Sequence, residues 1–334
     1  MNKVLSVAIA AYQAEATLRE TLESLAHVNA LALLDVIIVD DGSRDKTAEI
    51  AQEYVSRYPE AFRLCSKENG GWGSTVNKGI ELAQGKYLLQ LDSDDYVENM
   101  DALLAYLSRC DTDLVYAPHR TFRDRTGETC KLWTDPQHHP AATPLPLEQV
   151  NCVGSVHNLI IKTDILKTNH VTISEHCFYT DVGLVCKSYR YARTISYFDQ
   201  TVYAYRLSFS GQSMSKAGIR KHYRDHVLET ERLLDFRSEE QLDEHMDMLL
   251  VKRLRDMAYY CYLFFYALPA TAEQKRELIA YDDMLKAKAP DIYQQTQGPV
   301  LNLLRAVRFN GYWAAAHVKS AVDKLRRKNI YEAD

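Results

Sequence analysis

Short apolar runs alternate with segments of helical spacing through the first hundred residues. The apolar runs occupy residues 4–11, 34–39, 61–66 and 87–91. Runs of this length between turn-forming residues are typical of buried strands. Apolar residues recur at helical spacing over residues 14–27, 47–58, 74–84 and 99–109. This strand–helix alternation with short connections predicts an α/β fold with a mostly parallel sheet flanked by helices.

The pattern becomes irregular after about residue 113 and then changes to helix. Strands are expected at 114–117, at 158–161 and, one or two of them, over 194–207. A hairpin around Gly127 is expected over 119–134, and a Pro- and His-rich loop follows it. From 216 to 334 the spacing is helical almost throughout. We therefore predict one domain over residues 1–215, with halves 1–98 and 99–215, and a helical C-terminal region over 216–334.

Composition is that of a globular protein and excludes few classes. The 334 residues are 25% charged and 46% hydrophobic, and the formal net charge of −5 gives no sign of nucleic-acid binding. Seven scattered cysteines without a Cys-x-x-Cys pair predict free thiols in a reducing, cytoplasmic compartment and no zinc site. The longest apolar windows are too short for a transmembrane helix, and the N-terminal one is interpreted as a strand, not a signal peptide.

Three carboxylates follow the strand at 87–91, namely Asp92, Asp94 and Asp95. In an extended segment Asp92 and Asp94 point to the same side, where their charges repel unless a cation lies between them. Oxygen ligands of this kind suit Mg²⁺ or Mn²⁺, usually shared with a phosphate. The competing interpretation is a solvated acidic turn in which Asp95 caps the helix over 99–109.

Loops after three of the predicted strands converge on one edge of the sheet. With right-handed crossovers these are Ala10–Tyr12, Asp40–Ser43 and Asp92–Asp95. Ligands of open α/β sheets bind at this edge. The carboxylates of Asp40 and Asp41 suit the N–H and O–H donors of a base or ribose, but they also suit a local turn that bonds its own backbone amides.

Two further segments carry candidate chemistry. The loop from Asn69 to Ser74 precedes a helix and has glycines that could direct backbone N–H groups at a phosphate, with Lys78 one turn into the helix. The competing interpretation, which this loop alone favours, is an ordinary turn with a solvated lysine. Asp181 stands among apolar residues before another helix, where burial would raise its pKa toward that of a general base, and where it could instead cap the helix.

The remaining titratable side chains give no site pattern. Five histidines lack metal-ligand spacing and are expected on the surface or in the core: His138, His139, His157, His170 and His176. Cys177 and Cys186 have no evident histidine partner, so a catalytic thiol is not predicted.

Together these segments resemble family 2 glycosyltransferases of the GT-A fold. The matching stretches are Ser6–Tyr12, Ile37–Ser43, Asn69–Gly79 and Gly85–Asp95, with weaker matches at Tyr179–Asp181 and Tyr203–Arg206. The resemblance reaches to about residue 215 and does not cover the helical remainder. The sequence departs from the family pattern at Ala10–Gln13, where proline is usual, and at Thr180, where glutamate is usual.

The resemblance implies a nucleotide-diphospho-sugar donor, most often a UDP-sugar, and a divalent metal, Mn²⁺ or Mg²⁺. It implies that Asp41 contacts the uracil, Asp92 the ribose side, and that Asp94 with Asp92 holds the metal on the diphosphate. Asp181 would be the base of a single inverting displacement onto an acceptor hydroxyl. The implied donor-binding residues are Ala10, Tyr12, Asp40, Asp41, Gly71, Lys78, Asp92 and Ser93.

The resemblance also implies a place in cell-surface polysaccharide synthesis, with a glycan or lipid-linked acceptor. Basic residues outnumber acids seven to one between Leu301 and Lys328. That stretch suits either a helix resting on the inner face of an anionic plasma membrane or a helix packed on the protein with a solvated basic face. The aromatic run Tyr259–Tyr266 is expected in the core or at a subunit interface of a homo-oligomer.

Two other classes were compared with this interpretation. A receiver-like phosphorylation domain has its acidic pair near the first strand and a lysine after the fifth, whereas here the pair follows the second strand and residues 132–161 contain no such lysine. A sugar nucleotidyltransferase needs a glycine-rich, basic loop after the first strand, and Tyr12–Glu15 is neither.

Overall fold

The protein is described from a computed structural model of the 334-residue chain. The structure describes residues 2–124, 126–207, 215–268 and 271–314. The chain divides into two compact units, Met1–Leu207 and Ser208–Asp334, and each is described by itself. The predicted boundary at 215/216 adjoins residues 208–214, which lie outside the described residues, and the predicted halves 1–98 and 99–215 remain a prediction.

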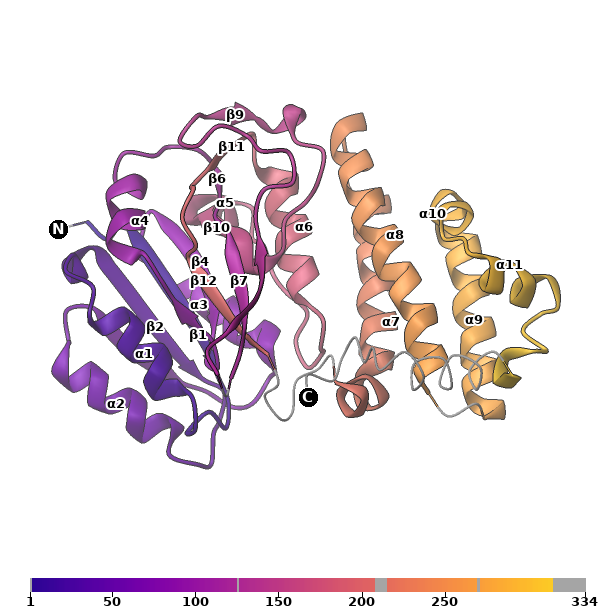
Figure 1. Cartoon of the computed structure of the whole chain (residues 1–334), viewed down its shortest axis with the longest axis horizontal. Coiled ribbons are helices and arrows are strands. Elements are labelled where there is room, and N and C mark those ends of the chain that lie inside the picture. The colour runs from indigo at the N-terminus through magenta and orange to yellow at the C-terminus, as the bar shows by residue number, and fades with distance from the viewer. Residues whose placement is uncertain (1, 125, 208–214, 269–270, 315–334) are drawn as a thin grey trace. The chain divides into compact units, whose positions relative to one another are not determined.

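The N-terminal part of the first unit is the predicted succession of βαβ units (Figure 1). Its strands lie parallel in the order β3-β2-β1-β4. They are β1 (Leu5–Ala11), β2 (Leu34–Asp40), β3 (Phe62–Ser66) and β4 (Tyr87–Asp92). The connecting helices are α1 (Leu18–Ala26), α2 (Thr47–Arg57) and α3 (Trp72–Leu82). The prediction of an α/β fold with a parallel sheet is confirmed for this part.

Side chains on β1 alternate between the two faces of the sheet. Val7 and Ile9 pack into the core beneath Leu18 and the rest of α1. On the other face the Cβ atom of Ala8 faces Gly79 of α3, where an added Cβ would lie only 2.6 Å from it. The small residues therefore let α3 approach the sheet closely, while the larger ones fill the space beneath α1.

The sheet continues with four strands from the later part of the unit, in the order β4-β10-β6-β11-β9. They are β6 (Leu114–Tyr116), β9 (Leu145–Pro146), β10 (Leu159–Lys162) and β11 (Thr194–Tyr197). The strand predicted at 158–161 is thus present as β10, but it runs antiparallel to both β4 and β6. Because of this direction, the residues that precede β10 lie at the carboxyl end of β4.

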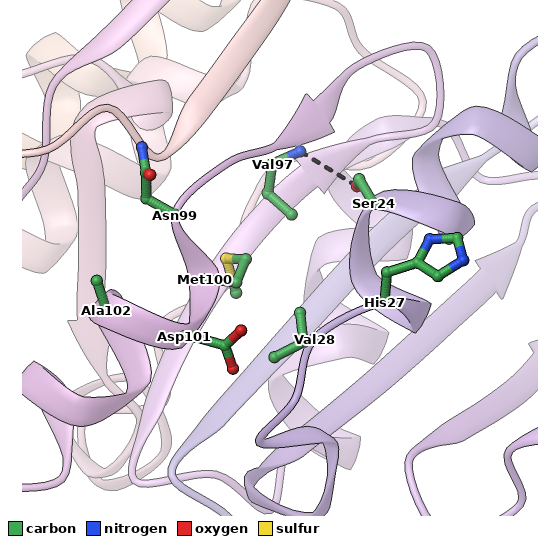
Figure 2. Close-up of a pocket in the computed structure, with 8 residues that line it drawn as sticks. All are labelled: Ser24, His27, Val28, Val97, Asn99, Met100, Asp101 and Ala102. Atoms are coloured by element: carbon green, nitrogen blue, oxygen red, sulfur yellow. Dashed lines mark hydrogen bonds between the residues drawn. The ribbon is translucent and has the colours of Figure 1, made fainter.

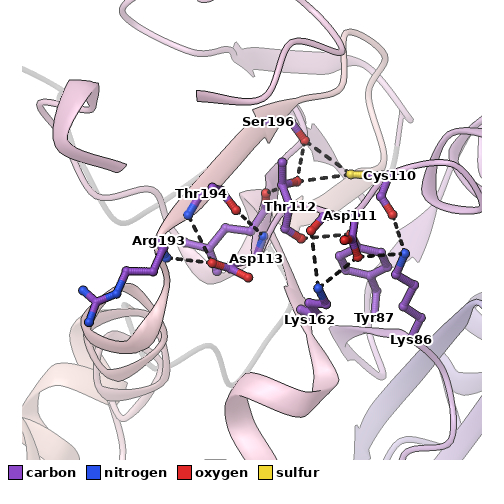
Figure 3. A network of polar contacts seen from close by, with 11 residues as sticks. Lys86, Tyr87, Cys110, Asp111, Thr112, Asp113, Lys162, Arg193, Thr194 and Ser196 are labelled. Atoms are coloured by element: carbon purple, nitrogen blue, oxygen red, sulfur yellow. Dashed lines mark hydrogen bonds and ion pairs between the residues drawn. The ribbon is translucent and has the colours of Figure 1, made fainter. Parts of the chain in front are cut away.

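A polar network fixes β10 at its other end (Figure 3). Lys86 directly precedes β4, and Lys162 is the last residue of β10. Their ammonium groups lie 3.2 and 3.0 Å, respectively, from Oδ1 of Asp111. The carboxylate of Asp113 accepts a hydrogen bond from the backbone N–H of Thr194 at 3.1 Å. These contacts join β4, β10, β6 and β11 at the edge opposite the predicted site, and they help to fix the register of the antiparallel strand.

A second, four-stranded sheet has the order β5-β12-β7-β8. Its strands are β5 (Tyr96–Val97), β7 (His119–Arg123), β8 (Thr129–Trp133) and β12 (Tyr203–Leu207). The antiparallel pairing of β7 with β8 confirms the predicted hairpin. The unit also contains α4 (Met100–Leu107), α5 (Thr163–Thr168) and α6 (Asp181–Tyr191), and the short 3₁₀ helices η1 (Leu31–Leu33), η2 (Leu147–Gln149) and η3 (Val156–Asn158).

The described part of the second unit is helical, as predicted (Figure 1). Its helices are α7 (Lys216–Glu239), α8 (Glu244–Ala267), α9 (Ala272–Lys288), α10 (Pro290–Gln295) and α11 (Pro299–Ala306). The three long helices begin at capping side chains, since Ser215, Asp243 and Thr271 each accept a hydrogen bond from a first-turn N–H. Most of the basic stretch up to Lys328 lies outside the described residues. No described helix is long and apolar enough to cross a membrane.

A buried carboxylate joins the helices of this unit. Asp282 of α9 accepts hydrogen bonds from the hydroxyl of Tyr262 on α8 at 2.6 Å and from Nε of Arg305 on α11 at 2.8 Å. Tyr262 belongs to the aromatic run and is fully buried, whereas Tyr259 and Tyr260 are exposed. The run therefore lies partly in the core of the unit.

A buried histidine on α7 gives the first prediction. His226 lies with Nδ1 3.1 Å from the sulfur of Cys261, and burial lowers its pKa to about 3, whereas an unfolded histidine has a pKa near 6.5. Below pH 6.5 the unfolded chain binds a proton at this histidine that the folded chain does not bind. The free energy of unfolding therefore decreases as the pH is lowered below 6.5. Urea titrations should show that His226→Gln loses about 2 kcal/mol less than wild type between pH 7.5 and pH 5.

The control is His222→Gln, one turn earlier on the same helix, where the side chain is only half-buried and bonds Asp225. This variant removes a histidine from the same helix and leaves the buried His226 in place. Equal pH dependence in His226→Gln and wild type would contradict the prediction.

Candidate active site

Strand register brings the predicted loops together at the carboxyl edge of the parallel strands. β1 is the centre of this arrangement, because Ala11 lies opposite Asp40 of β2 and Ala10 lies opposite Asp92 of β4. The backbone N–H of Asp41 also donates to the carbonyl of Ala11 at 2.9 Å. The convergence predicted from the βαβ pattern is therefore present in the structure.

The carboxylate of Asp41 organises the glycine loop. Its Oδ1 accepts hydrogen bonds from Nζ of Lys67 at 2.8 Å and from the N–H of Gly70 at 3.0 Å, and Oδ2 accepts from the N–H of Gly71 at 2.8 Å. Gly71 has a φ of +82°, a conformation that favours glycine, and it is the N-cap of α3. A buried acid thus holds the backbone of this loop at the start of a helix.

Other predicted donor-side residues have varied surroundings. Asp40 is buried and accepts a local hydrogen bond from the N–H of Ser43 at 3.0 Å. The ring of Tyr12 is 54% exposed. Lys78 bonds Glu81 on its own helix, at 2.8 Å. Ser93 is buried, and its carbonyl accepts from the hydroxyl of Thr21 at 3.0 Å.

Asp92 is the most perturbed of the half-buried acids. Its Oδ1 accepts a hydrogen bond from the indole Nε1 of Trp72 at 2.7 Å. Burial raises its pKa to about 7, and the negative charges of Asp94 and Asp181 act in the same direction. Asp181 therefore lies within electrostatic reach of Asp92, although the two are far apart in the sequence.

The neighbouring Asp95 does not cap α4, so that interpretation of the acidic turn is wrong. Asp95 is fully buried, and its carboxylate accepts hydrogen bonds from the hydroxyl of Tyr203 and from the N–H of Arg206, each at 2.7 Å. Nε of Arg206 also donates to the carbonyl of Asp94 at 2.6 Å. Two residues of β12 thus fix the turn, and the carboxyl group of Asp94 is left half-buried with a pKa raised mainly by burial.

A histidine lies beside these acids, although the spacing of the histidines along the chain gave no sign of a metal site. The carboxylate oxygens of Asp92 and Asp95 and a ring nitrogen of His157 all lie within 4.8 Å of one another. Among the described residues this is a group with the side-chain types and spacing of a metal site. Asp94 is outside the group, so its predicted metal role rests on the resemblance and on its position two residues from Asp92.

The segment that leads to Asp181 is attached to the start of α3. Asn77 bonds it in both directions, with Nδ2 donating to the carbonyl of Ile173 at 2.9 Å and Oδ1 accepting from the N–H of the same residue at 2.8 Å. The N–H of His176 donates to the carbonyl of Gly70 at 2.6 Å. Asp181 itself is the first residue of α6 and follows the N-cap Thr180, so it is not the cap of that helix.

The arrangement combines acids with a backbone loop at a helix start, which suits a cation together with a phosphorylated ligand. Sequence patterns missed three supports of this site, namely Lys67, Trp72 and His157. Lys67 precedes the glycine loop and Trp72 lies within it, but no local pattern indicated which acid each side chain would contact. His157 directly precedes a predicted strand, and only the direction of that strand places it beside Asp92.

A separate pocket of about 390 Å³ opens beside α1 and α4 (Figure 2). Its lining residues are Ser24, His27, Val28, Val97, Asn99, Met100, Asp101 and Ala102. Asp101 is already occupied there by the backbone N–H of Ala30 at 3.0 Å and the side chain of Asn29 at 2.8 Å. The pocket shares no residue with the predicted site, all of whose residues the structure describes.

Comparison with known proteins gives one family match. Residues 6–167 match the model of the family described as glycosyl transferase family 2. A similar curated protein is the putative glycosyltransferase EpsH of Bacillus subtilis, 28% identical over 218 residues, which are 62% of this chain and 61% of that protein. The chain thus spans less than two thirds of that relative.

Two further similarities extend over nearly the whole chain. The poly(ribitol-phosphate) beta-N-acetylglucosaminyltransferase TarS of Staphylococcus aureus is 23% identical over 339 residues, which cover 98% of this chain and 57% of that protein. The crystal structure of TarS 1-349 with UDP-GlcNAc superposes with a TM-score of 0.71 at 22% identity, covering 95% of this chain and 92% of that one. A mannosyltransferase from Pyrobaculum calidifontis, in complex with GDP-Man and Mn²⁺, gives 0.56 at 16% identity, covering 97% and 88%. These structures show that the fold is of the same kind.

The raised pKa of Asp92 predicts a pH-dependent gain of stability when its charge is removed. The pKa of Asp92 is about 7 in the folded protein and about 3.9 in the unfolded chain. Between these values the folded protein binds a proton that the unfolded chain has lost, so the free energy of unfolding decreases as the pH rises from about 4 to 7. In metal-free buffer, Asp92→Asn should raise the free energy of unfolding at pH 8 by about 1–3 kcal/mol and have little effect at pH 4.5. Urea titrations at both pH values measure this, with exposed Asp199→Asn as the control. An Asp92→Asn protein less stable than wild type at pH 8 would be the opposite result.

The close contact between Gly73 of α3 and the segment before Asp181 predicts that a methyl group added at Gly73 displaces that segment. A Cβ at Gly73 would lie 2.0 Å from the carbonyl oxygen of Ser174, so the segment must move. Gly73→Ala should therefore lower stability by about 1–3 kcal/mol and speed amide exchange at residues 173–177. In Gly311→Ala the new Cβ meets only an ordinary contact with Leu304 at 3.5 Å, and that variant should behave as wild type. Unchanged exchange in Gly73→Ala would show that the contact does not hold the segment.

Proposed function

The chain belongs to glycosyl transferase family 2 through residues 6–167, and on that premise we propose that it transfers a sugar from a UDP-sugar to a hydroxyl group. The observation that carries the proposal is the set of acids at the sheet edge, where burial and the charges of Asp94 and Asp181 raise the pKa of Asp92 to about 7, and where burial raises that of Asp94. Perturbed acids in this position are typical of sites that bind a charged ligand. The TarS structure with UDP-GlcNAc supports UDP as the nucleotide.

We assign the donor to the loops around β1. In this proposal Asp41 faces the uracil while its carboxylate keeps the glycine loop in place, and Asp92 faces the ribose. The exposed ring of Tyr12 and the small side chain of Ala10 line the same edge. The N–H groups at the start of α3, beside Gly71, are directed by the helix toward an anion such as a diphosphate.

The residues present fit a divalent cation, since oxygen and imidazole ligands lie close together and the acids repel one another without one. Asp94 and Asp92 would hold it, with Mn²⁺ or Mg²⁺ as the ion. When bound, the ion would supply positive charge for the diphosphate leaving group.

Asp181 is the proposed general base. It begins α6 on a segment that Asn77 and Gly70 attach to the donor edge, and its charge acts on Asp92. In that place it accepts the proton of the acceptor hydroxyl, whose oxygen attacks the anomeric carbon in a single displacement with inversion. The carboxylate keeps the transferred proton while the donor's glycosidic oxygen departs with the diphosphate.

The proposed acceptor is a hydroxyl of a glycan or lipid-linked glycan in cell-surface polysaccharide synthesis, on the cytoplasmic side of the membrane. The polymer named for TarS supports this class of acceptor. The basic stretch that ends at Lys328 is the proposed contact with the inner face of the membrane, and the exposed Tyr259 and Tyr260 of α8 are the proposed contact in a homo-oligomer.

Nucleotide binding tests the proposal. UDP with Mn²⁺ should raise the unfolding temperature of wild type, because a ligand at about 100 times its Kd adds ~2.7 kcal/mol to stability. GDP and CDP should give smaller shifts. Asp94→Asn should lose the Mn²⁺-dependent shift, whereas Asp181→Asn should keep it and lose about 10²–10⁴-fold in the rate of UDP release from a UDP-sugar.

Asp199→Asn is the matched control, since its exposed side chain lies on a loop of the same unit. It should bind and react as wild type. A shift from GDP or CDP alone would overturn UDP as the donor nucleotide. The absence of any nucleotide shift in wild type would overturn the transferase proposal.

A further inference from the structure

We propose that His157 is a nitrogen ligand of the cation site and that it gives the site a preference for Mn²⁺ over Mg²⁺. This inference rests on the proposed function and deepens it, since it adds a residue from the second half of the first unit to the acids of β4. It begins from a juxtaposition: a ring nitrogen of His157 lies within 4.8 Å of carboxylate oxygens of Asp92 and Asp95.

The direction of β10 places His157 at this position. Ile160 lies opposite Leu89 in the antiparallel pair, and continuing this register by three residues puts His157 beside Asp92. A parallel strand would have carried the residue to the far edge of the sheet. The adjacent Asn158 is buried and exchanges two hydrogen bonds with Ala117 at the end of β6, at 2.8 and 2.9 Å. The backbone that presents His157 is therefore fixed on both sides.

Aromatic neighbours surround the imidazole ring. Its centroid lies 4.9 Å from that of Tyr203, in an edge-on arrangement, and 4.7 Å from that of Tyr205. The buried ring of His119 lies 5.4 Å away. Packing on these sides restricts the rotation of the ring, as is required of a metal ligand whose position must be set before the ion binds.

The distances suit a cation. Two atoms bonded to one ion at about 2.1 Å are at most about 4.2 Å apart, so ligand atoms within 4.8 Å need only a small movement to share it. Asp95 is already held by Tyr203 and Arg206, which makes it the part of the cluster that orients the turn. We therefore assign Asp92 and His157 as ligands from these distances, and keep Asp94 as the ligand named in the proposed function.

The ligand chemistry decides the preference. Mg²⁺ requires oxygen ligands and retains much of its water. Mn²⁺ also suits oxygen ligands, but it belongs to the first-row series that binds mixed nitrogen and oxygen sites, although at the weak end of that series. A site of carboxylates alone would bind both ions in the usual way, but an imidazole adds affinity mainly for Mn²⁺. The chain's own residues would thereby select between the two ions named in the proposed function.

Pulsed electron paramagnetic resonance of bound Mn²⁺ tests the inference directly. The wild-type protein with UDP and Mn²⁺ should show modulation from a coordinated imidazole nitrogen, and His157→Gln should lose it. Mn²⁺ affinity, measured by titration with UDP present, should fall at least about tenfold in His157→Gln, since changes outside the ligand sphere alone cost about 10–100-fold. Mg²⁺ affinity should change by less than about threefold.

His27→Gln is the control, because His27 is exposed and lines the separate pocket beside α1 and α4, so its replacement should leave both signals unchanged. Nitrogen modulation is read on wild type, so the test does not depend on whether the variant folds. UDP·Mn²⁺ that binds wild type without nitrogen modulation would overturn this inference and leave the proposed function intact. If no nucleotide–metal complex bound wild type, both would fall.

Discussion

The rest of the site depends on the hydrogen bonds that join the carboxylate of Asp95 to β12. Asp95 is fully buried just after β4 and accepts hydrogen bonds from the hydroxyl of Tyr203 and the backbone N–H of Arg206 on β12. An acid in this position without partners would be costly, so the turn can form only when β12 is in place. The same turn carries Asp92 and Asp94, and their spacing is therefore set by a strand that lies more than a hundred residues later.

Burial raises the pKa of all three acids in this turn, and the charges of Asp94 and Asp92 raise that of Asp95 further. Asp92 receives one hydrogen bond from Trp72, and the charges of Asp94 and Asp181 act against its ionisation. Burial raises the pKa of Asp94 as well, and Arg206 opposes that rise only in part. The ionised form of all three acids is therefore unfavourable, a state that a positively charged ligand would relieve. Perturbed acids grouped in this way are typical of functional sites.

Local patterns predicted the parts of this structure that local forces determine. The apolar runs and the helical spacing before residue 98 correspond to β1–β4 and α1–α3, because a buried strand and an amphipathic helix each have their own period. The carboxyl-edge cluster also followed, since parallel pairing through β1 places Ala10 beside Asp92 and Ala11 beside Asp40.

The parts that failed depend on contacts between distant segments. The strand at 158–161 was predicted, but no local signal showed that it runs antiparallel, and so His157 was assigned to the surface or core and not to the site. Asp95 was considered as a cap of α4 because the helix is close in sequence, whereas its partners on β12 are distant. For Lys67 and Trp72 the sequence showed their place in the loop, but not the carboxylate that each would bind.

The distribution of these residues makes the site a product of the whole first unit. Residues before 98 supply Asp41, Asp92 and Asp94, and the order of the early strands would permit them to form a sheet edge. Tyr203 and Arg206 orient the acidic turn, and the segment bonded by Asn77 carries Asp181 to it. The early strands alone would therefore carry the acids without the contacts from β12 that orient the acidic turn. The proposed nucleotide site and the proposed base are linked through α3, because Asp41 holds the loop at its start and Asn77 holds the segment that leads to Asp181.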